Sequence, residues 1–319
     1  MYSNLYKICA NLVVCKFIIE PKPLKFVDKV RTEILFQKTM QTALITGANS
    51  GIGLATAKAL AKQQFQLILL VRSEEKAEQT KKDILKQTPE AKLDFYVADL
   101  ADLASVKKAA DAIKQKYASL DRLINNAGYS PVGMSFTADG YEKSFVANHL
   151  GHFVLTMNLL DLLKNSPESR VINVSSAAHA FGKFARLFQK RNMSLSDMKA
   201  YGDGKLANVL FTKKLAKYEK NSSVTTYALH PGVVKSNFGS DMNGLLKIVF
   251  SVFRPLMISV EEGAATSIYL ATTDFKNLKS KNGFYFAKSK PTYTSNNGIT
   301  NENIELFWQK SLEATQGFI

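Results

Sequence analysis

Tyr201 and Lys205 are separated by four positions in the stretch Tyr201-Gly202-Asp203-Gly204-Lys205. In a helix this spacing puts both side chains on one face, one turn apart. Lowering the pKa of a tyrosine from about 10 to about 7 requires roughly 4 kcal/mol in favour of the phenolate. An ammonium group about 4 Å away, in an effective dielectric of about 20, supplies about that much. The pair could therefore exchange a proton with a hydroxyl or carbonyl group, although such pairs also occur on solvated helix faces.

A glycine-rich loop runs from Thr46 to Gly53, between the short apolar run Thr42–Ile45 and a helical pattern over Leu54–Gln63. Glycines allow a tight turn and a close backbone approach, and a helix N-terminus offers free N–H groups to an anion. The strand–loop–helix context predicts a cradle for the phosphates of a dinucleotide. The predicted contacts are Gly47, Asn49, Ser50, Gly51, Ile52 and Gly53.

The next two predicted strands end at residues suited to the adenosine half of that dinucleotide. Arg72 follows the strand Gln66–Val71, where an acidic residue would bind the ribose hydroxyls of NAD. A guanidinium suits a 2′-phosphate instead, so Arg72 predicts NADP(H); the alternative is a surface arginine before the helix cap Ser73. Asp99 and Leu100 follow the strand Leu93–Ala98, where Asp99 could bind the adenine amino group or simply cap a turn.

Strand-like and helix-like segments alternate along the rest of the chain. This alternation predicts one α/β domain of Rossmann type, a doubly wound parallel sheet of about seven strands with helices on both faces. The remaining strands are expected at Leu120–Ile124, Val171–Val174, Val224–Leu229 and Gly283–Ala287, and the helices at Asp102–Tyr117, Tyr141–Leu163, Tyr201–Tyr218, around Glu261–Ala264 and at Ile304–Leu312. His149 and His152 share the second of these helices, but the chain has only four histidines and no further ligand cluster, so we expect no metal site.

Composition is that of a soluble globular protein, with 46% hydrophobic and 22% charged residues. The formal net charge of +15 could attract nucleic acid, an acidic membrane or an anionic cofactor. The basic residues are scattered and no nucleic-acid motif accompanies them, so we expect no nucleic-acid partner.

The two cysteines, Cys9 and Cys15, leave the main body without a disulfide, which fits a reducing compartment such as the cytoplasm.

Residues 1–39 differ from the chain that follows. The segment Leu5–Ile19 is apolar but is interrupted by Lys7 and Lys16, so it is too short and too charged for a membrane-spanning helix. We expect an N-terminal extension that is either disordered or weakly associated with a membrane, followed by the main domain over residues 40–319.

The motifs together resemble the short-chain dehydrogenase/reductase superfamily from about residue 40 to the C-terminus. They are the glycine loop, Asn125–Gly128, Asn148, Ser176, Tyr201-x-x-x-Lys205 and Pro231-Gly232, in the order of that family. The stretches Asn148–Phe153, Val174–His179 and Lys205–Phe211 look like the retinol dehydrogenase branch. One departure is Gly204, where the family commonly has serine; two glycines in this turn lower its helix propensity by about 1 kcal/mol each.

The resemblance implies a role for each matching residue. Tyr201 would be the acid/base, Lys205 would lower its pKa and bind the nicotinamide ribose, and Ser176 would hydrogen-bond the reacting oxygen. Asn148 would hold a water that links Lys205 to solvent. The cofactor contacts that the resemblance adds are Asn125, Ala127, Gly128, Pro231, Gly232, Val234 and Ser236, the last standing where the family usually has threonine.

The apolar stretch Leu245–Ile258 follows the Pro231-Gly232 turn. It could be core, but its position suits a substrate lid over residues 236–262 and predicts a small lipophilic alcohol or carbonyl substrate. Residues 180–198 form an insertion with four basic side chains, either a pocket rim or a solvated loop.

The leading hypothesis is an NADP(H)-dependent oxidoreductase that transfers a hydride to or from such a substrate. The alternative is a cofactor-binding regulatory or interaction protein on the same fold with little turnover. The resemblance leaves open a homo-oligomer and a peripheral membrane contact.

Overall fold

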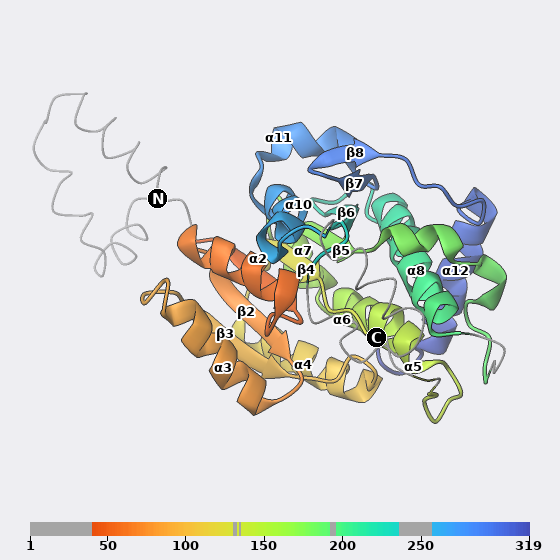
Figure 1. Cartoon of the computed structure of the whole chain (residues 1–319), viewed down its shortest axis with the longest axis horizontal. Coiled ribbons are helices and arrows are strands. Elements are labelled where there is room, and N and C mark those ends of the chain that lie inside the picture. Colours follow the sequence, from red (N-terminus) through yellow and green to blue (C-terminus); the bar gives the residue numbers. More distant parts are fainter. Residues whose placement is uncertain (1–39, 130–132, 134, 192–195, 236–256) are drawn as a thin grey trace, which may run out of the picture. The chain divides into compact units, whose positions relative to one another are not determined.

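The computed structural model describes residues 40–129, 133, 135–191, 196–235 and 257–319. Eight strands in this part of the chain form one sheet in the order β3-β2-β1-β4-β5-β6-β7-β8 (Figure 1). Neighbouring strands are parallel except for the last pair. The strands are β1 (Thr42–Thr46), β2 (Gln66–Val71), β3 (Leu93–Val97), β4 (Arg122–Asn125), β5 (Arg170–Val174), β6 (Thr225–His230), β7 (Tyr285–Ala287) and β8 (Lys290–Thr292).

The strand order reverses between β1 and β4, because β2 and β3 lie on one side of β1 and β4 to β8 lie on the other. In open α/β sheets a ligand binds in the crevice outside the carboxyl ends of the strands at such a switch point. The chain places the glycine loop after β1 and Asn125–Gly128 at the end of β4. Sequence motifs that are about 80 residues apart therefore meet at this edge of the sheet, as their hydrogen bonds show.

Helices cover both faces of the sheet (Figure 1). Successive side chains of a strand point to opposite faces, so Ala43 and Ile45 of β1 pack on one side and Leu44 on the other. The side of Ala43 and Ile45 is covered by α2 (Gly51–Lys62), α3 (Glu74–Leu85), α10 (Val260–Thr272) and α11 (Phe275–Leu278). The side of Leu44 is covered by α4 (Leu103–Lys116), α5 (Lys143–Phe145), α6 (Gly151–Asn158), α7 (Leu160–Lys164), α8 (Asp197–Tyr218) and α12 (Asn301–Ala314).

The predicted doubly wound α/β sheet is confirmed, with one strand more than expected. The additional strand is β8, a short edge strand that pairs antiparallel with β7.

None of the helices in the described ranges combines the length and apolar composition that a bilayer crossing requires. The predicted N-terminal extension and residues 236–256 of the predicted lid lie outside the described residues.

A helical run covers most of the helix predicted over Tyr141–Leu163, but it is not one regular α-helix. The structure has α5, a π-turn over Val146–Leu150 in which the Gly151 N–H bonds to the Val146 carbonyl, and then α6 and α7. The Asn148 side chain explains the break, because its Nδ2 donates to the Ser144 carbonyl at 2.8 Å. In a regular α-helix the Ser144 carbonyl would accept from the backbone N–H of Asn148. A side chain that bonds to this carbonyl disrupts the backbone hydrogen bonds of the helix.

Candidate active site

The glycine loop has the backbone that a phosphate cradle needs. Gly47 and Gly51 have φ values of +65° and +51°, which glycine adopts without steric cost. A Cβ at Gly53 would lie 2.2 Å from the Gly47 carbonyl oxygen, so only glycine fits. Helix α2 begins at Gly51, and its cap Ser50 makes no side-chain capping bond. The first amides of α2 are therefore suited to a pyrophosphate.

The segment that follows β4 holds the start of this loop in place. Thr46 Oγ accepts hydrogen bonds from the backbone N–H groups of Asn126 and Ala127 at 3.0 and 2.9 Å. Asn126 Nδ2 donates to the Thr46 carbonyl at 2.9 Å. Asn125 points the other way, and its Nδ2 donates to Asn173 Oδ1 at 2.8 Å between β4 and β5. Asn125 thus links two central strands of the sheet, while Thr46 and Asn126 fix the loop.

The residues predicted for the adenosine half lie at the ends of β2 and β3. Arg72 is exposed just beyond β2, and Ser73 caps α3 by accepting a hydrogen bond from the Lys76 N–H. Asp99 is exposed, and its Oδ1 accepts a hydrogen bond from the Ala101 N–H at 2.9 Å. This is the turn-capping role that the sequence left open beside adenine binding. Leu100 is buried, and its carbonyl faces Gly151, where a Cβ would come within 2.3 Å.

Ser176, Tyr201 and Lys205 meet beyond the carboxyl end of β5. Ser176 follows that strand and its side chain is hydrogen-bonded to Tyr201. Lys205 is buried, and its Nζ donates to the carbonyl of Val174 in β5 at 3.0 Å and lies 5.5 Å from the centre of the Tyr201 ring. Ser175, the neighbour of Ser176, donates from Oγ to the Lys205 carbonyl at 2.7 Å. The predicted proton-transfer residues are therefore assembled on α8 and β5.

The pKa of Tyr201 shifts in the direction opposite to that expected from the sequence. Burial raises the pKa of Tyr201 to about 12, and the hydrogen bond with Ser176 lowers it only in part. Burial also lowers the pKa of Lys205 to about 8. That Lys205 lowers the pKa of Tyr201 stays a prediction; its Nζ lies 5.5 Å from the ring centre, and burial is the main cause of the raised pKa. Tyr201 therefore keeps its proton near neutral pH and is suited to act as an acid.

Asn148 is fully buried in the π-turn, and the polar atoms of its side chain are hydrogen-bonded. Nδ2 donates to the carbonyls of Tyr129 and Ser144, and Oδ1 accepts from the Tyr129 N–H at 3.1 Å. Asn148 thereby ties the segment after Gly128 to the π-turn. The water that the resemblance assigns to Asn148 stays a prediction.

The turn after β6 closes against α10. Gly232 follows Pro231 and has a φ of +96°, and a Cβ there would lie 2.5 Å from Ile258 Cδ1. Val234 forms a parallel bridge with Ile258. Val234 and Ile52 both face Gly263 of α10, so two predicted cofactor residues that are distant in sequence lie at one helix. Ser236 lies outside the described residues.

The insertion between Ser176 and Tyr201 is held to the catalytic helix by an ion pair. Arg186 donates from Nε and Nη2 to the two carboxylate oxygens of Asp203 at 2.8 and 2.6 Å. The Lys183 N–H donates to the same carboxylate at 2.8 Å. Asp203 lies between Tyr201 and Lys205, so at Arg186 the insertion is packed against the turn that carries them rather than solvated.

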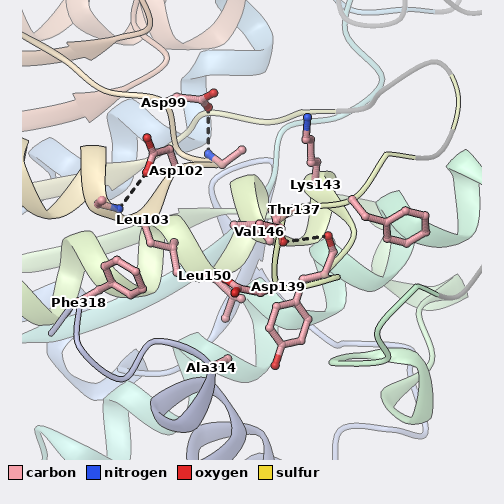
Figure 2. Close-up of a pocket in the computed structure, with 15 residues that line it drawn as sticks. Asp99, Asp102, Leu103, Thr137, Asp139, Lys143, Val146, Leu150, Ala314 and Phe318 are labelled. Carbon is pink, nitrogen blue, oxygen red and sulfur yellow. Dashed lines mark hydrogen bonds between the residues drawn. The ribbon is translucent and has the colours of Figure 1, made fainter.

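A pocket of about 480 Å³ lies away from these residues, between the start of α4, the segment 136–143 and the C-terminus. In Figure 2, Asp99 and Asp102 stand at its edge, each bonded to a backbone amide, while Leu150 and Phe318 supply apolar walls. Ser176, Tyr201 and Lys205 do not line it. Two of its carboxylates, those of Asp99 and Asp102, thus cap local turns.

Sequence reasoning missed three residues of this site: Thr46, Asn126 and His152. Thr46 and Asn126 directly precede residues that were selected, so their position in the motifs was the available signal. His152 is buried, with Nδ1 3.1 Å from the Asn148 carbonyl oxygen and Nε2 2.9 Å from Thr46 Oγ. It was considered only as a metal ligand, and its pairing with Thr46 across 106 positions has no signature in the sequence.

Comparison with known proteins agrees with this geometry. A sequence profile of the family described as short chain dehydrogenase matches residues 41–244. Retinol dehydrogenase 12 of Bos taurus is 38% identical over 302 residues, 93% of this chain and 93% of that protein. Retinol dehydrogenase 13 of Homo sapiens is 39% identical over 280 residues, 85% of this chain and 83% of that protein.

Among solved structures, the NADPH-bound carbonyl reductase from chicken fatty liver superposes with a TM-score of 0.60 at 22% identity. The match covers 80% of this chain and 99% of that one, and it supports the fold alone. The profile match and the identity to retinol dehydrogenases over most of the length show that the chain belongs to the short-chain dehydrogenase/reductase family, in its retinol dehydrogenase-like branch.

Proposed function

We propose that the protein is an NADP(H)-dependent oxidoreductase that transfers a hydride between nicotinamide and a lipophilic carbonyl or alcohol. The observation that carries the proposal is the assembly of Ser176, Tyr201 and Lys205 beyond the carboxyl end of β5, in a family that uses a nicotinamide cofactor. The cradle at Gly47–Gly53 fits the pyrophosphate of that cofactor, because the backbone turns sharply there and leaves no room for a side chain at Gly53.

The geometry suits carbonyl reduction. The bound nicotinamide supplies the hydride to the carbonyl carbon. Tyr201, which holds its proton at neutral pH, donates that proton to the carbonyl oxygen as negative charge develops there. Ser176, bonded to Tyr201, stabilises the same oxygen through its hydroxyl. Lys205 is within 5.5 Å of the Tyr201 ring, so its ammonium favours the phenolate that remains.

Three observations support the choice of cofactor and substrate. Arg72 is exposed at the end of β2, where it can reach a 2′-phosphate. Relatives that are 38% and 39% identical are named as retinol dehydrogenases, and the stretch Leu245–Ile258 is strongly apolar. We therefore propose NADP(H) rather than NAD(H), and a retinoid-like, lipid or other lipophilic aldehyde or ketone as substrate.

The test is the consumption of NADPH with a panel of carbonyl compounds that includes retinal and long-chain aldehydes. Tyr201→Phe should reduce kcat by a factor of about 10² to 10⁴, with NADPH binding retained. Tyr218→Phe is the matched control, because Tyr218 is the exposed last residue of the same helix and should leave kcat unchanged. NADPH binding without turnover of any compound would favour the alternative, a cofactor-binding regulatory or interaction protein.

The cofactor preference is tested separately with Arg72→Ala. This variant should weaken NADPH binding about tenfold or more, the loss of a charge-assisted contact, and leave NADH binding nearly unchanged. Lys76→Ala removes another exposed cation near the start of α3 and serves as the control. Equal weakening of the two cofactors by Arg72→Ala would contradict the proposed NADP(H) preference.

A further inference from the structure

His152 lies between the two halves of the candidate site, and the proposed reaction does not use it. It is 1% exposed in α6. Its Nδ1 lies 3.1 Å from the carbonyl oxygen of Asn148 in the π-turn, and its Nε2 lies 2.9 Å from Oγ of Thr46 at the end of β1. One imidazole thus joins the turn that carries Asn148 to the residue from which the glycine loop starts.

The partners of His152 fix its tautomer. A backbone carbonyl can only accept, so the proton must be on Nδ1, and Nε2 then carries a lone pair. Thr46 Oγ already accepts from the N–H groups of Asn126 and Ala127, which uses both of its lone pairs. Its own hydroxyl hydrogen has two acceptors within reach, the Ile124 carbonyl at 3.5 Å and Nε2 of His152 at 2.9 Å, and the shorter distance assigns it to Nε2. The opposite tautomer would set Nδ1 against the carbonyl lone pairs and give Thr46 Oγ a third donor.

We propose that His152 is a positioning residue that holds the Asn148 turn and the cofactor loop in a fixed relation to each other. The bridge from Asn148 through His152 to Thr46, called here the His152 bridge, couples the binding of the dinucleotide to the alignment of the proton-transfer groups. The effect on the alignment of the proton-transfer groups rests on the proposed function. His152 does not relay a proton. The Asn148 carbonyl at Nδ1 cannot pass a proton on, and neither can the backbone N–H groups that donate to Thr46 Oγ.

The environment of His152 keeps the imidazole neutral, as the bridge requires. Burial is the main cause and lowers the pKa of His152 to about 4, the hydrogen bond to Asn148 opposes this shift, and the nearby charge of Lys205 adds to it. A protonated ring would turn Nε2 into a donor facing the Thr46 hydroxyl and break the arrangement.

His149, in the π-turn that precedes α6, provides a matched buried histidine as a control. It is fully buried, but its Nε2 lies 3.0 Å from Ser311 Oγ on α12, and Ser311 donates its own hydrogen to the Phe307 carbonyl. Ser311 Oγ must therefore accept from His149, which puts the proton on Nε2. His149 contacts the core of the domain and neither Asn148 nor Thr46 through its ring nitrogens.

The two halves of the bridge can be separated by substitution. In His152→Asn the amide nitrogen can replace Nδ1 and donate to Asn148, whereas Thr46 loses its acceptor. In His152→Gln the amide oxygen can replace Nε2 and accept from Thr46, whereas Asn148 loses its donor. We expect His152→Asn to raise the NADPH dissociation constant about tenfold with kcat at saturating NADPH nearly unchanged. We expect His152→Gln to lower kcat about tenfold with the dissociation constant nearly unchanged.

His149→Asn should lower the melting temperature without changing the NADPH dissociation constant or kcat. A purely structural role for His152 would make its two variants behave like His149→Asn, or lose binding and turnover in equal measure. Either result would overturn the proposal.

The tautomers give a readout that needs neither cofactor nor turnover. In the full chain with ¹⁵N-labelled histidine, ring-nitrogen NMR should show the proton on Nδ1 for His152 and on Nε2 for His149, assigned from the spectra of the Asn variants. A proton on Nε2 of His152 would refute the bridge. If the chain bound no NADPH and reduced no carbonyl, the proposed function would fail, while the tautomers would still decide whether the bridge exists.

Discussion

Two buried histidines should make the protein unstable in mild acid. Burial lowers the pKa of His149 to about 3 and that of His152 to about 4, whereas histidine in an unfolded chain titrates near pH 6.5. Both folded-state values are depressed, so the stabilisation is present above pH 6.5 and is lost as the pH falls towards the folded values. In that range the unfolded chain binds protons that the folded chain excludes.

The size of the effect follows from the same values. Between about pH 7 and pH 5 the folded protein keeps both rings neutral, while the unfolded chain protonates almost all of its histidine. Linkage then gives a loss of about 2 kcal/mol of unfolding free energy for each ring. Replacing either histidine by asparagine removes one titrating group, so the loss between the two pH values should shrink by about 2 kcal/mol, whatever the substitution does at pH 7.

The assay is urea unfolding of the full chain at pH 7, 6 and 5, followed by circular dichroism and analysed by linear extrapolation. Phe153→Leu is the control, since Phe153 is buried in α6 but does not titrate. This substitution should lower the free energy of unfolding by the same amount at every pH. The reasoning would be refuted if His149→Asn and His152→Asn lost as much free energy between pH 7 and pH 5 as the unsubstituted protein.

Three further predictions concern the site. Because the pKa of Lys205 is about 8, its ammonium is present below that pH, and kcat/KM for NADPH, measured from initial rates, should fall above it; a fall that starts only near pH 10 would contradict this. Gly53→Ala places a Cβ 2.2 Å from the Gly47 carbonyl oxygen and should raise the NADPH dissociation constant, measured by fluorescence titration, at least about tenfold. Arg186→Met leaves the buried Asp203 carboxylate without its guanidinium and should cost about 3 kcal/mol in urea unfolding, whereas a loss below about 1 kcal/mol would indicate an ordinary surface pair.

The sequence was informative wherever a strand is buried on both faces. Such strands are short apolar runs, and β2 was predicted with its observed bounds, Gln66–Val71. The chemistry-bearing loops follow directly after these runs, so their position at one edge of the sheet could also be predicted. Seven of the eight strands in the described ranges were located, with ends that shift by at most two residues, although β3 is only partly buried.

The eighth strand could not be predicted because nothing in its sequence marks it. Strand β8 is exposed, contains Pro291 and has no apolar alternation. The turn that joins it to β7 has positive φ values at Lys288 and Ser289, where a hairpin of this kind usually has asparagine or glycine. Pairing with β7 therefore decides the conformation of this segment against its local preference.

Tertiary contacts likewise decided what the sequence could not show around Tyr201. Spacing alone predicted that the ammonium of Lys205 would act on the phenol of Tyr201. In the structure Nζ lies 5.5 Å from the centre of the Tyr201 ring and also donates to the carbonyl of Val174, a strand residue whose nearness to Nζ no helical pattern reveals. The helix break at Asn148 has the same origin, because a side chain there competes with the backbone of its own helix.

The glycines at 202 and 204 look unfavourable in a helix, yet close packing accounts for both. A Cβ at Gly204 would lie 3.1 Å from Cβ of Asn148, and a Cβ at Gly202 would lie 3.0 Å from the Ala178 carbonyl oxygen. The turn between Tyr201 and Lys205 thus approaches the Asn148 turn on one side and the segment after Ser176 on the other. The helix propensity that is lost, about 1 kcal/mol for each glycine, is offset by contacts that larger residues would prevent. The same two positions set how closely Tyr201 can approach its partners, so their lack of a side chain contributes directly to the geometry of proton transfer.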